Sequence, residues 1–109
     1  MNSLNIEKGE KNLKQLALSP TNLDAFIDTH YKFLERLYFC KEKVYQLEKS
    51  SSDDQPEKIG EYKQEAKKWV ELLKKLVKLD RHLFGRMNKA RFTKSCKEHL
   101  EYFKNKYNH

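Results

Sequence analysis

A chain of 109 residues with a formal net charge of +7 has room for one hydrophobic core. Charged residues make up 36% of the sequence and hydrophobic residues 38%, with only three Gly and two Pro, a balance typical of long amphipathic helices. No apolar run approaches the roughly 18 residues that span a bilayer, and the N-terminus lacks the apolar core of a signal peptide. We therefore expect a cytoplasmic protein that does not contact a membrane.

Residues 3–18 predict a short, weak helix, because their leucines recur at helical spacing but Gly9 interrupts them. The segment 19–24 then holds two overlapping helix-start signals, a serine before a proline and a Thr-x-x-Asp capping box. A long helix is expected over residues 21–49.

The predicted helix over residues 21–49 has one nearly unbroken apolar row. Its 3-4-3-4 spacing keeps one side chain per turn on a single face. The row contains Leu23, Phe26, His30, Phe33, Leu37, Cys40, Val44 and Leu47. A second row beside it widens the buried arc beyond what one neighbouring helix covers, so this helix should contact at least two others. His30 is the only polar member of the first row.

Polar residues over 50–56 predict a loop, since Ser and Asp side chains compete for backbone hydrogen bonds and Pro56 disfavours helix in the residue before it. The helical period resumes over residues 57–90, so two long helices form a hairpin. Antiparallel folding pairs residues whose numbers sum to roughly 106, which places Leu37 near Trp69.

A last, basic helix is predicted over residues 93–107. The helical spacing slips around residues 88–95, and Ser95 followed by Glu98 is another capping box. Periodicity does not decide whether this helix folds back on the hairpin. For the whole chain we predict a single all-α domain, an antiparallel helical bundle of three to four helices built on a long helical hairpin.

The sequence contains no pattern that indicates catalysis. It has no glycine-rich phosphate loop, no pair of His at metalloprotease spacing, and no Ser or Cys with a recognisable base, so we expect a non-catalytic protein. The nearest approach to a metal site is Cys96 with His99, which Cys40 and His30 would have to complete. A buried thiol beside an exposed imidazole is the simpler interpretation. We expect no metal, no other cofactor and reduced cysteines.

His30 and Asp80 each occupy a position where their helix otherwise places apolar side chains. Burying either group alone costs several kcal/mol, and the register of the hairpin brings the two within about one turn of each other. We therefore expect a pair that fixes this register. An acid–base dyad is the less favoured alternative, because it needs a cleft and a third group.

Cations gather toward the C-terminal end. Residues 81–109 contain eight Lys and Arg against two Glu, so they account for +6 of the net +7. At about 100° per residue, the exposed side of the predicted helix over 57–90 is also basic. Such a stripe suits a nucleic-acid backbone, because these side chains neutralise phosphates. The residues expected to bind are Lys78, Arg81, Arg86, Lys89, Arg91, Lys94 and Lys97. A solvated lysine face is the equally weighted alternative.

The expected function is that of an accessory subunit that binds the backbone of RNA or DNA within a larger complex. No helix-turn-helix, zinc-finger or RNA-binding-sheet signature is present, so binding would follow backbone and shape. The alternative is a protein-binding adaptor, inhibitor or immunity-type module that docks an acidic partner protein. Tyr31, Tyr38 and Tyr45 share one flank and would form its contact patch, although such rings more commonly lie at the edge of a core. A homo-oligomer is compatible with either function.

Overall fold

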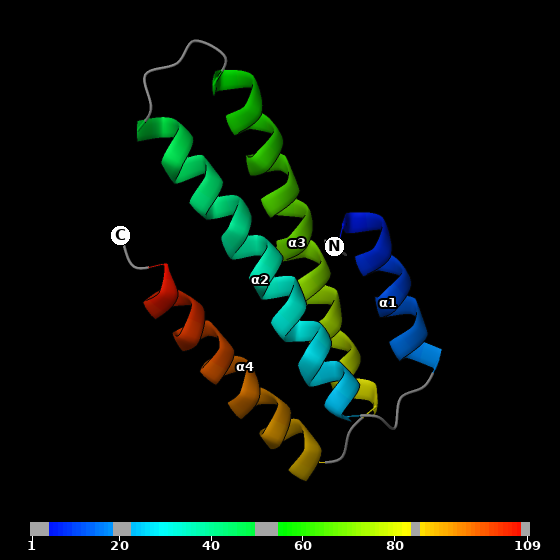
Figure 1. The fold of residues 1–109 in the computed structure, drawn as a ribbon. Coiled ribbons are helices and arrows are strands. Elements are labelled where there is room, and N and C mark those ends of the chain that lie inside the picture. Colours follow the sequence, from blue (N-terminus) through cyan, green and yellow to red (C-terminus); the bar gives the residue numbers. More distant parts are fainter. Residues whose placement is uncertain (1–4, 19–22, 50–54, 84–85, 108–109) are drawn as a thin grey trace.

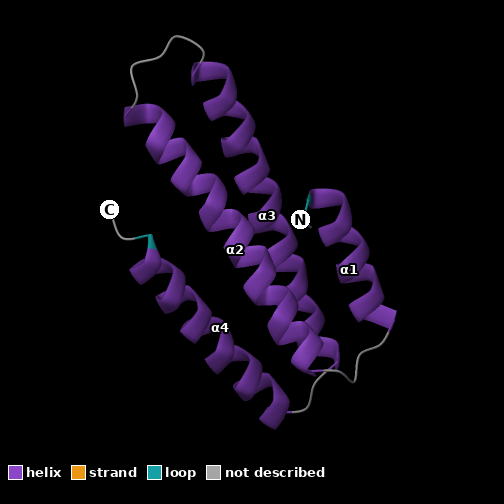
Figure 2. Cartoon of the chain, viewed as in Figure 1, coloured by secondary structure: helices purple, strands orange, loops and turns teal. Residues whose placement is uncertain are grey.

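The computed structural model describes the backbone of residues 5–18, 23–49, 55–83 and 86–107, and the side chains of all of these except 55, 80–83 and 86–88. Within them lie four α-helices and no strand (Figures 1 and 2): α1 Ile6–Leu18, α2 Leu23–Lys49, α3 Gln55–Leu83 and α4 Arg86–Lys106. The predicted all-α helical bundle is confirmed. None of these helices, over its described residues, is long and apolar enough to cross a membrane.

The helices α2 and α3 form the predicted antiparallel hairpin, and α1 and α4 pack on opposite sides of it (Figure 1). Helix α1 contacts both α3 and α2, whereas α4 has its contacts with α2. Phe92 of α4 lies against Phe26 and Phe103 lies against Tyr38, so α4 folds back and runs parallel to α2. The sequence left this path open.

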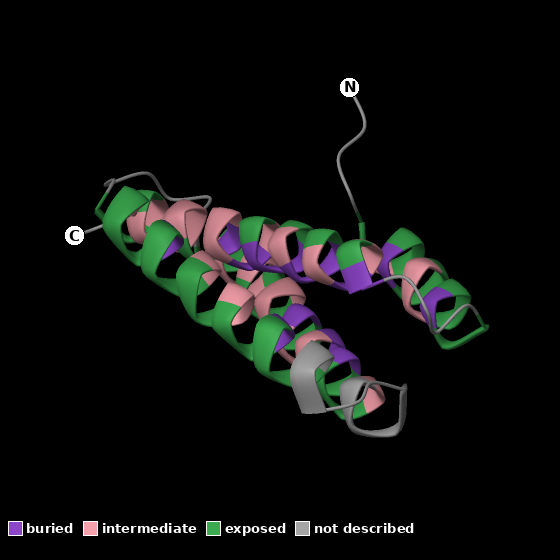
Figure 3. Cartoon of the chain, turned by 90° about the horizontal axis from the view of Figure 1, so that it is seen from below, coloured by how far each residue is buried: buried purple, intermediate pink, exposed green. Residues whose placement is uncertain are grey.

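The core lies between α2 and α3 and extends to α1 and α4. The apolar row of α2 faces inward as predicted, with Phe26, Phe33 and Cys40 fully buried. The ring of Trp69 on α3 is also fully buried and lies 5.4 Å from the ring of Phe33, about one turn from the predicted register. Figure 3 shows the buried residues on the facing sides of the helices and the exposed residues on their outer sides.

Two helices start at other residues than predicted. Helix α1 begins at Ile6 because Asn5 caps it: the side-chain Oδ1 accepts a hydrogen bond from the backbone N–H of Lys8 at 2.8 Å. Helix α3 begins at Gln55, so Pro56 stands in the first helical turn, where its missing N–H costs nothing. The start signals at residues 19–22 and the loop at 50–54 lie outside the described residues.

The boundary between the last two helices was also predicted wrongly. Helix α3 ends at Leu83, where the prediction had residue 90, and α4 begins at Arg86, where the prediction had residue 93. The Ser95 capping box lies inside α4. Gly85 stands between the helices in the sequence, and glycine has the lowest helix propensity after proline. The predicted continuous stripe on the third helix is therefore divided between α3 and α4.

Gly9 allows α1 to approach the core closely. A Cβ atom there would lie 2.8 Å from Cζ3 of Trp69, whose ring is fully buried, whereas a Cβ atom at Gly60 would have no neighbour within 4 Å. We expect overpacking, at about 1–3 kcal/mol, to outweigh the gain of about 1 kcal/mol in helix propensity, so Gly9→Ala should lower the free energy of unfolding by up to about 2 kcal/mol. Gly60→Ala should raise it by about 0.5–1 kcal/mol through helix propensity. Urea unfolding followed by circular dichroism measures both, and changes of the same sign would contradict this account of α1.

Candidate functional site

Helix α4 is held on α2 by an aromatic inner face. Phe92 and Phe103 are buried, and their rings lie 6.2 Å from Phe26 and 5.6 Å from Tyr38. Burial of a side chain of this size stabilises the docked helix by about 1.5–3 kcal/mol. The opposite side of α4 is consequently directed to solvent.

Cations dominate the solvent side of α4. The helix contains seven Lys and Arg and two Glu, against five acids and five bases in α2. The members whose side chains the structure describes are all exposed: Lys89, Arg91, Lys94, Lys97, Lys104 and Lys106. The ion pairs found among the described side chains are at other helices, and none includes a cation of α4. None of these cations therefore forms an ion pair with a carboxylate of the described part of the chain, although the exposed Glu98 and Glu101 lie on the same helix.

Four of these lysines form what we name the α4 basic side: Lys89, Lys94, Lys97 and Lys104. The first three border a shallow hollow of about 450 Å³, together with Ala90 and Thr93. Lys104 follows Lys97 by seven residues, which is about two helical turns or roughly 10 Å, so it extends the same side, on which the exposed Glu101 lies between these two lysines. The sequence prediction missed Lys104, although its seven-residue spacing from Lys97 was a usable signal.

The predicted binding residues do not all share this side. Lys89, Arg91, Lys94 and Lys97 are on α4, but Lys78 is on α3 beside α1, where it borders a hollow with Leu13 and Ala17. Helix α1 and α4 lie on opposite sides of the hairpin (Figure 1), so Lys78 is separated from the α4 basic side. The side chains of Arg81 and Arg86 lie outside the described residues.

The tyrosine flank of α2 forms part of the seat of α4. The ring of Phe103 lies 5.0 Å from that of Tyr31 and stacks on that of Tyr38. Tyr45 is half-buried beneath the ammonium group of Lys49, which lies 4.3 Å from the ring centroid. Tyr31 and Tyr38 are therefore half-buried because they pack at the edge of the core.

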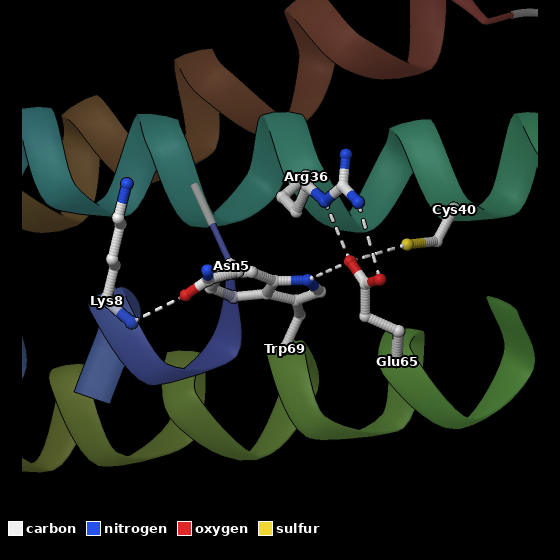
Figure 4. Close-up of polar contacts among 6 residues, drawn as sticks. All are labelled: Asn5, Lys8, Arg36, Cys40, Glu65 and Trp69. Carbon is white, nitrogen blue, oxygen red and sulfur yellow. Dashed lines mark hydrogen bonds and ion pairs between the residues drawn. The ribbon is translucent and has the colours of Figure 1, made fainter. Parts of the chain in front are cut away.

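A polar cluster that the sequence prediction missed lies between α2 and α3, around Glu65 (Figure 4). Its Oε2 atom accepts hydrogen bonds from Arg36 Nε at 2.7 Å, Trp69 Nε1 at 2.8 Å and the Cys40 thiol at 3.2 Å. Burial acts to raise the pKa of Glu65, but these three bonds outweigh it and the pKa falls below its ordinary value of 4.5. Burial, with the bond to Glu65, raises the pKa of Cys40 to about 12, so its thiol stays protonated and is a poor nucleophile.

The buried His30 contacts a second histidine. Its Nδ1 atom lies 3.0 Å from Nδ1 of His99 on α4, and the two rings stack. The side chain of Asp80, its predicted partner, lies outside the described residues. Cys40 is bonded to Glu65 instead of joining a metal site, and the described residues contain no group of three or more potential metal ligands.

No protein-family model, curated protein or solved structure matches this chain. The function is therefore argued from the side chains alone.

Proposed function

We propose that the α4 basic side binds the phosphate backbone of RNA or DNA, and that the chain is a non-catalytic accessory subunit of a larger complex. The observation that carries this proposal is a row of exposed lysines, without ion pairs among the described side chains, on a helix that aromatic packing fixes in place.

The stability of α4 explains only part of its charge, because Lys104 and Lys106 stand in the last turn, where the helix dipole favours a cation. Lys89 stands at the first turn of the helix, which contains no acidic residue, and a cation there is repelled by the helix dipole by about 0.3–1 kcal/mol. A solvated surface ordinarily mixes both signs of charge, as α2 does with its five acids and five bases. An excess of +5 on α4 instead favours an anionic ligand.

The side chains of the α4 basic side favour contacts to the backbone over contacts to bases. Each ammonium group neutralises one phosphate and releases condensed counterions, which strengthens binding at low salt. Ala90 and Thr93, the other residues of the hollow, have no planar polar group that pairs with a base edge in two places. Binding should therefore be independent of base sequence.

The salt dependence of binding tests the proposal. Four lysines on a single strand predict a slope of about −3 for the logarithm of the binding constant against the logarithm of salt concentration. Fluorescence anisotropy with labelled single-stranded RNA and DNA of mixed sequence measures this slope. Polyglutamate of equal charge serves as the competitor, and its preferential binding would assign the surface to an acidic protein partner. Binding to neither polyanion at 50 mM salt would refute both functions.

A further inference from the structure

Two imidazoles between α2 and α4 are placed so that one proton is shared between their Nδ1 atoms. His30 is 5% exposed, its Nδ1 atom lies 3.0 Å from that of His99, and the ring centroids are 5.2 Å apart. A hydrogen bond between two imidazole nitrogens needs a proton on one and a lone pair on the other. The contact is therefore lost, and becomes repulsive, when both rings are charged.

The described surroundings of the pair do not favour a cation on His30. Phe92 of α4 meets the His30 ring edge to face, and Tyr31 of α2 meets the His99 ring in the same way. Among the described side chains, the charged group acting on the pair is Glu98 of α4, which acts on His99. In the observed register the charged residues of α3 level with His30 are Glu71, Lys74 and Lys75, whose side chains are exposed, and the side chain of Asp80, farther along α3, lies outside the described residues.

Burial, followed by the charge of His99, lowers the pKa of His30 from its ordinary 6.5 to about 4. Burial also lowers the pKa of His99, against the opposing effect of Glu98. The chain with α4 docked thus binds fewer protons than a chain with α4 undocked, in which His30 of α2 would lose the cover of α4 and regain its ordinary pKa of 6.5. The equilibrium constant for docking of α4 is therefore highest above pH 6.5 and falls as the pH falls toward 4. For the titration of His30 alone, it is lower by about 30-fold at pH 5.

The contacts among α1, α2 and α3 do not depend on α4, although Phe92 and Phe103 of α4 pack on the same core. Helix α4 contacts α2, while α1, α2 and α3 contact one another, and the cluster of Glu65, Arg36 and Trp69 contains no residue of α4. We propose that the His30–His99 pair is an acid-sensitive latch that holds α4 on α2 and weakens when a second proton enters the pair. This inference concerns the docking of α4 and does not depend on what the α4 basic side binds.

Amide hydrogen exchange on the full chain tests the latch. The measured quantity is the protection of α4 amides relative to that of α3 amides, a ratio in which the intrinsic pH dependence of exchange cancels. Between pH 7.5 and 5.0 this ratio should fall by about 30-fold in the wild type. In His30→Gln the fall should nearly disappear, and in the control His109→Gln, which removes a histidine outside the pair, it should persist.

Two results would overturn the latch. One is an unchanged ratio in the wild type, and the other is an equal fall in wild type and His30→Gln. If His30→Gln does not fold, the pH titration of the His30 imidazole in the wild type, followed by nuclear magnetic resonance, replaces this comparison. The latch predicts titration well below pH 6.5, and titration near 6.5 would contradict it.

Discussion

Glu65→Ala should lower the free energy of unfolding by about 3 kcal/mol, the largest effect that we expect from a single side chain away from the aromatic core. Removing one partner of a buried ion pair costs about 3–5 kcal/mol, because the remaining charge is left without compensation. The pair with Arg36 is about one quarter exposed, which reduces the cost of breaking it. The substitution also leaves the Trp69 N–H and the Cys40 thiol without their hydrogen-bond acceptor, which adds to the cost.

Urea unfolding followed by the fluorescence of Trp69 measures this loss. Glu71→Ala is the matched control, because Glu71 lies on the same helix and pairs with Lys74 while both side chains are two-thirds exposed. An exposed pair of this kind contributes about 0–1 kcal/mol. Equal losses for the two variants would show that the Glu65 cluster does not stabilise the hairpin.

The pH dependence of Glu65 falls in a different range from that of the histidine pair. Because its pKa is lowered below 4.5 in the folded chain, the contribution of Glu65 is present above pH 4.5 and is lost as the pH falls through the folded value. The difference in stability between wild type and Glu65→Gln should therefore shrink only below about pH 4.5. Weakening of α4 docking should occur at higher pH than this.

Reversing three charges of the α4 basic side should weaken nucleic-acid binding by about 100-fold at 50 mM salt. The variant is Lys94→Glu, Lys97→Glu and Lys104→Glu. Each lost contact to a phosphate is worth about 1 kcal/mol at 4 Å in water, and three such contacts correspond to a factor of about 100. All three side chains are exposed, so the fold should be retained, and circular dichroism checks this.

A charge-matched variant separates a local site from a general charge effect. Lys8, Lys11 and Lys58 are exposed residues of α1 and of the start of α3, and their replacement by Glu also changes the net charge from +7 to +1. Charges farther away than the screening length of about 10 Å at 0.1 M salt contribute little. Equal weakening in both triple variants would mean that net charge, and not α4, determines binding.

The apolar spacing of the sequence predicted the hairpin and its inner face, because one side chain per turn has to be buried on each long helix. The same spacing placed His30 inside, where it is. From the sequence, His99 was expected near His30 only within the less favoured metal site, because this contact depends on the path of α4, and periodicity does not encode that path. Glu65 was missed because it looks like any other glutamate among lysines. Its place in the polar cluster depends on hydrogen bonds from Arg36 and Cys40 of α2, which the sequence around Glu65 does not indicate.

The candidate site was predicted only in part, because the charge of the C-terminal residues was clear but their arrangement was not. Placing the helix boundary between residues 90 and 93 put Lys78 and Lys89 on one continuous helix. Helix α3 ends at Leu83, and α4, which begins at Arg86, lies on the opposite side of the hairpin from α1, whereas Lys78 lies beside α1.

The most direct test of the α4 basic side is a footprint by nuclear magnetic resonance on the 15N-labelled full chain. A short single-stranded oligonucleotide is added at low salt and neutral pH, and the shift of each backbone amide is followed. We predict that the largest shifts fall on residues 89–104 of α4, with α1 and the Lys78 region of α3 unchanged. Shifts centred on α1 and Lys78, or no saturable shift at all, would contradict the account.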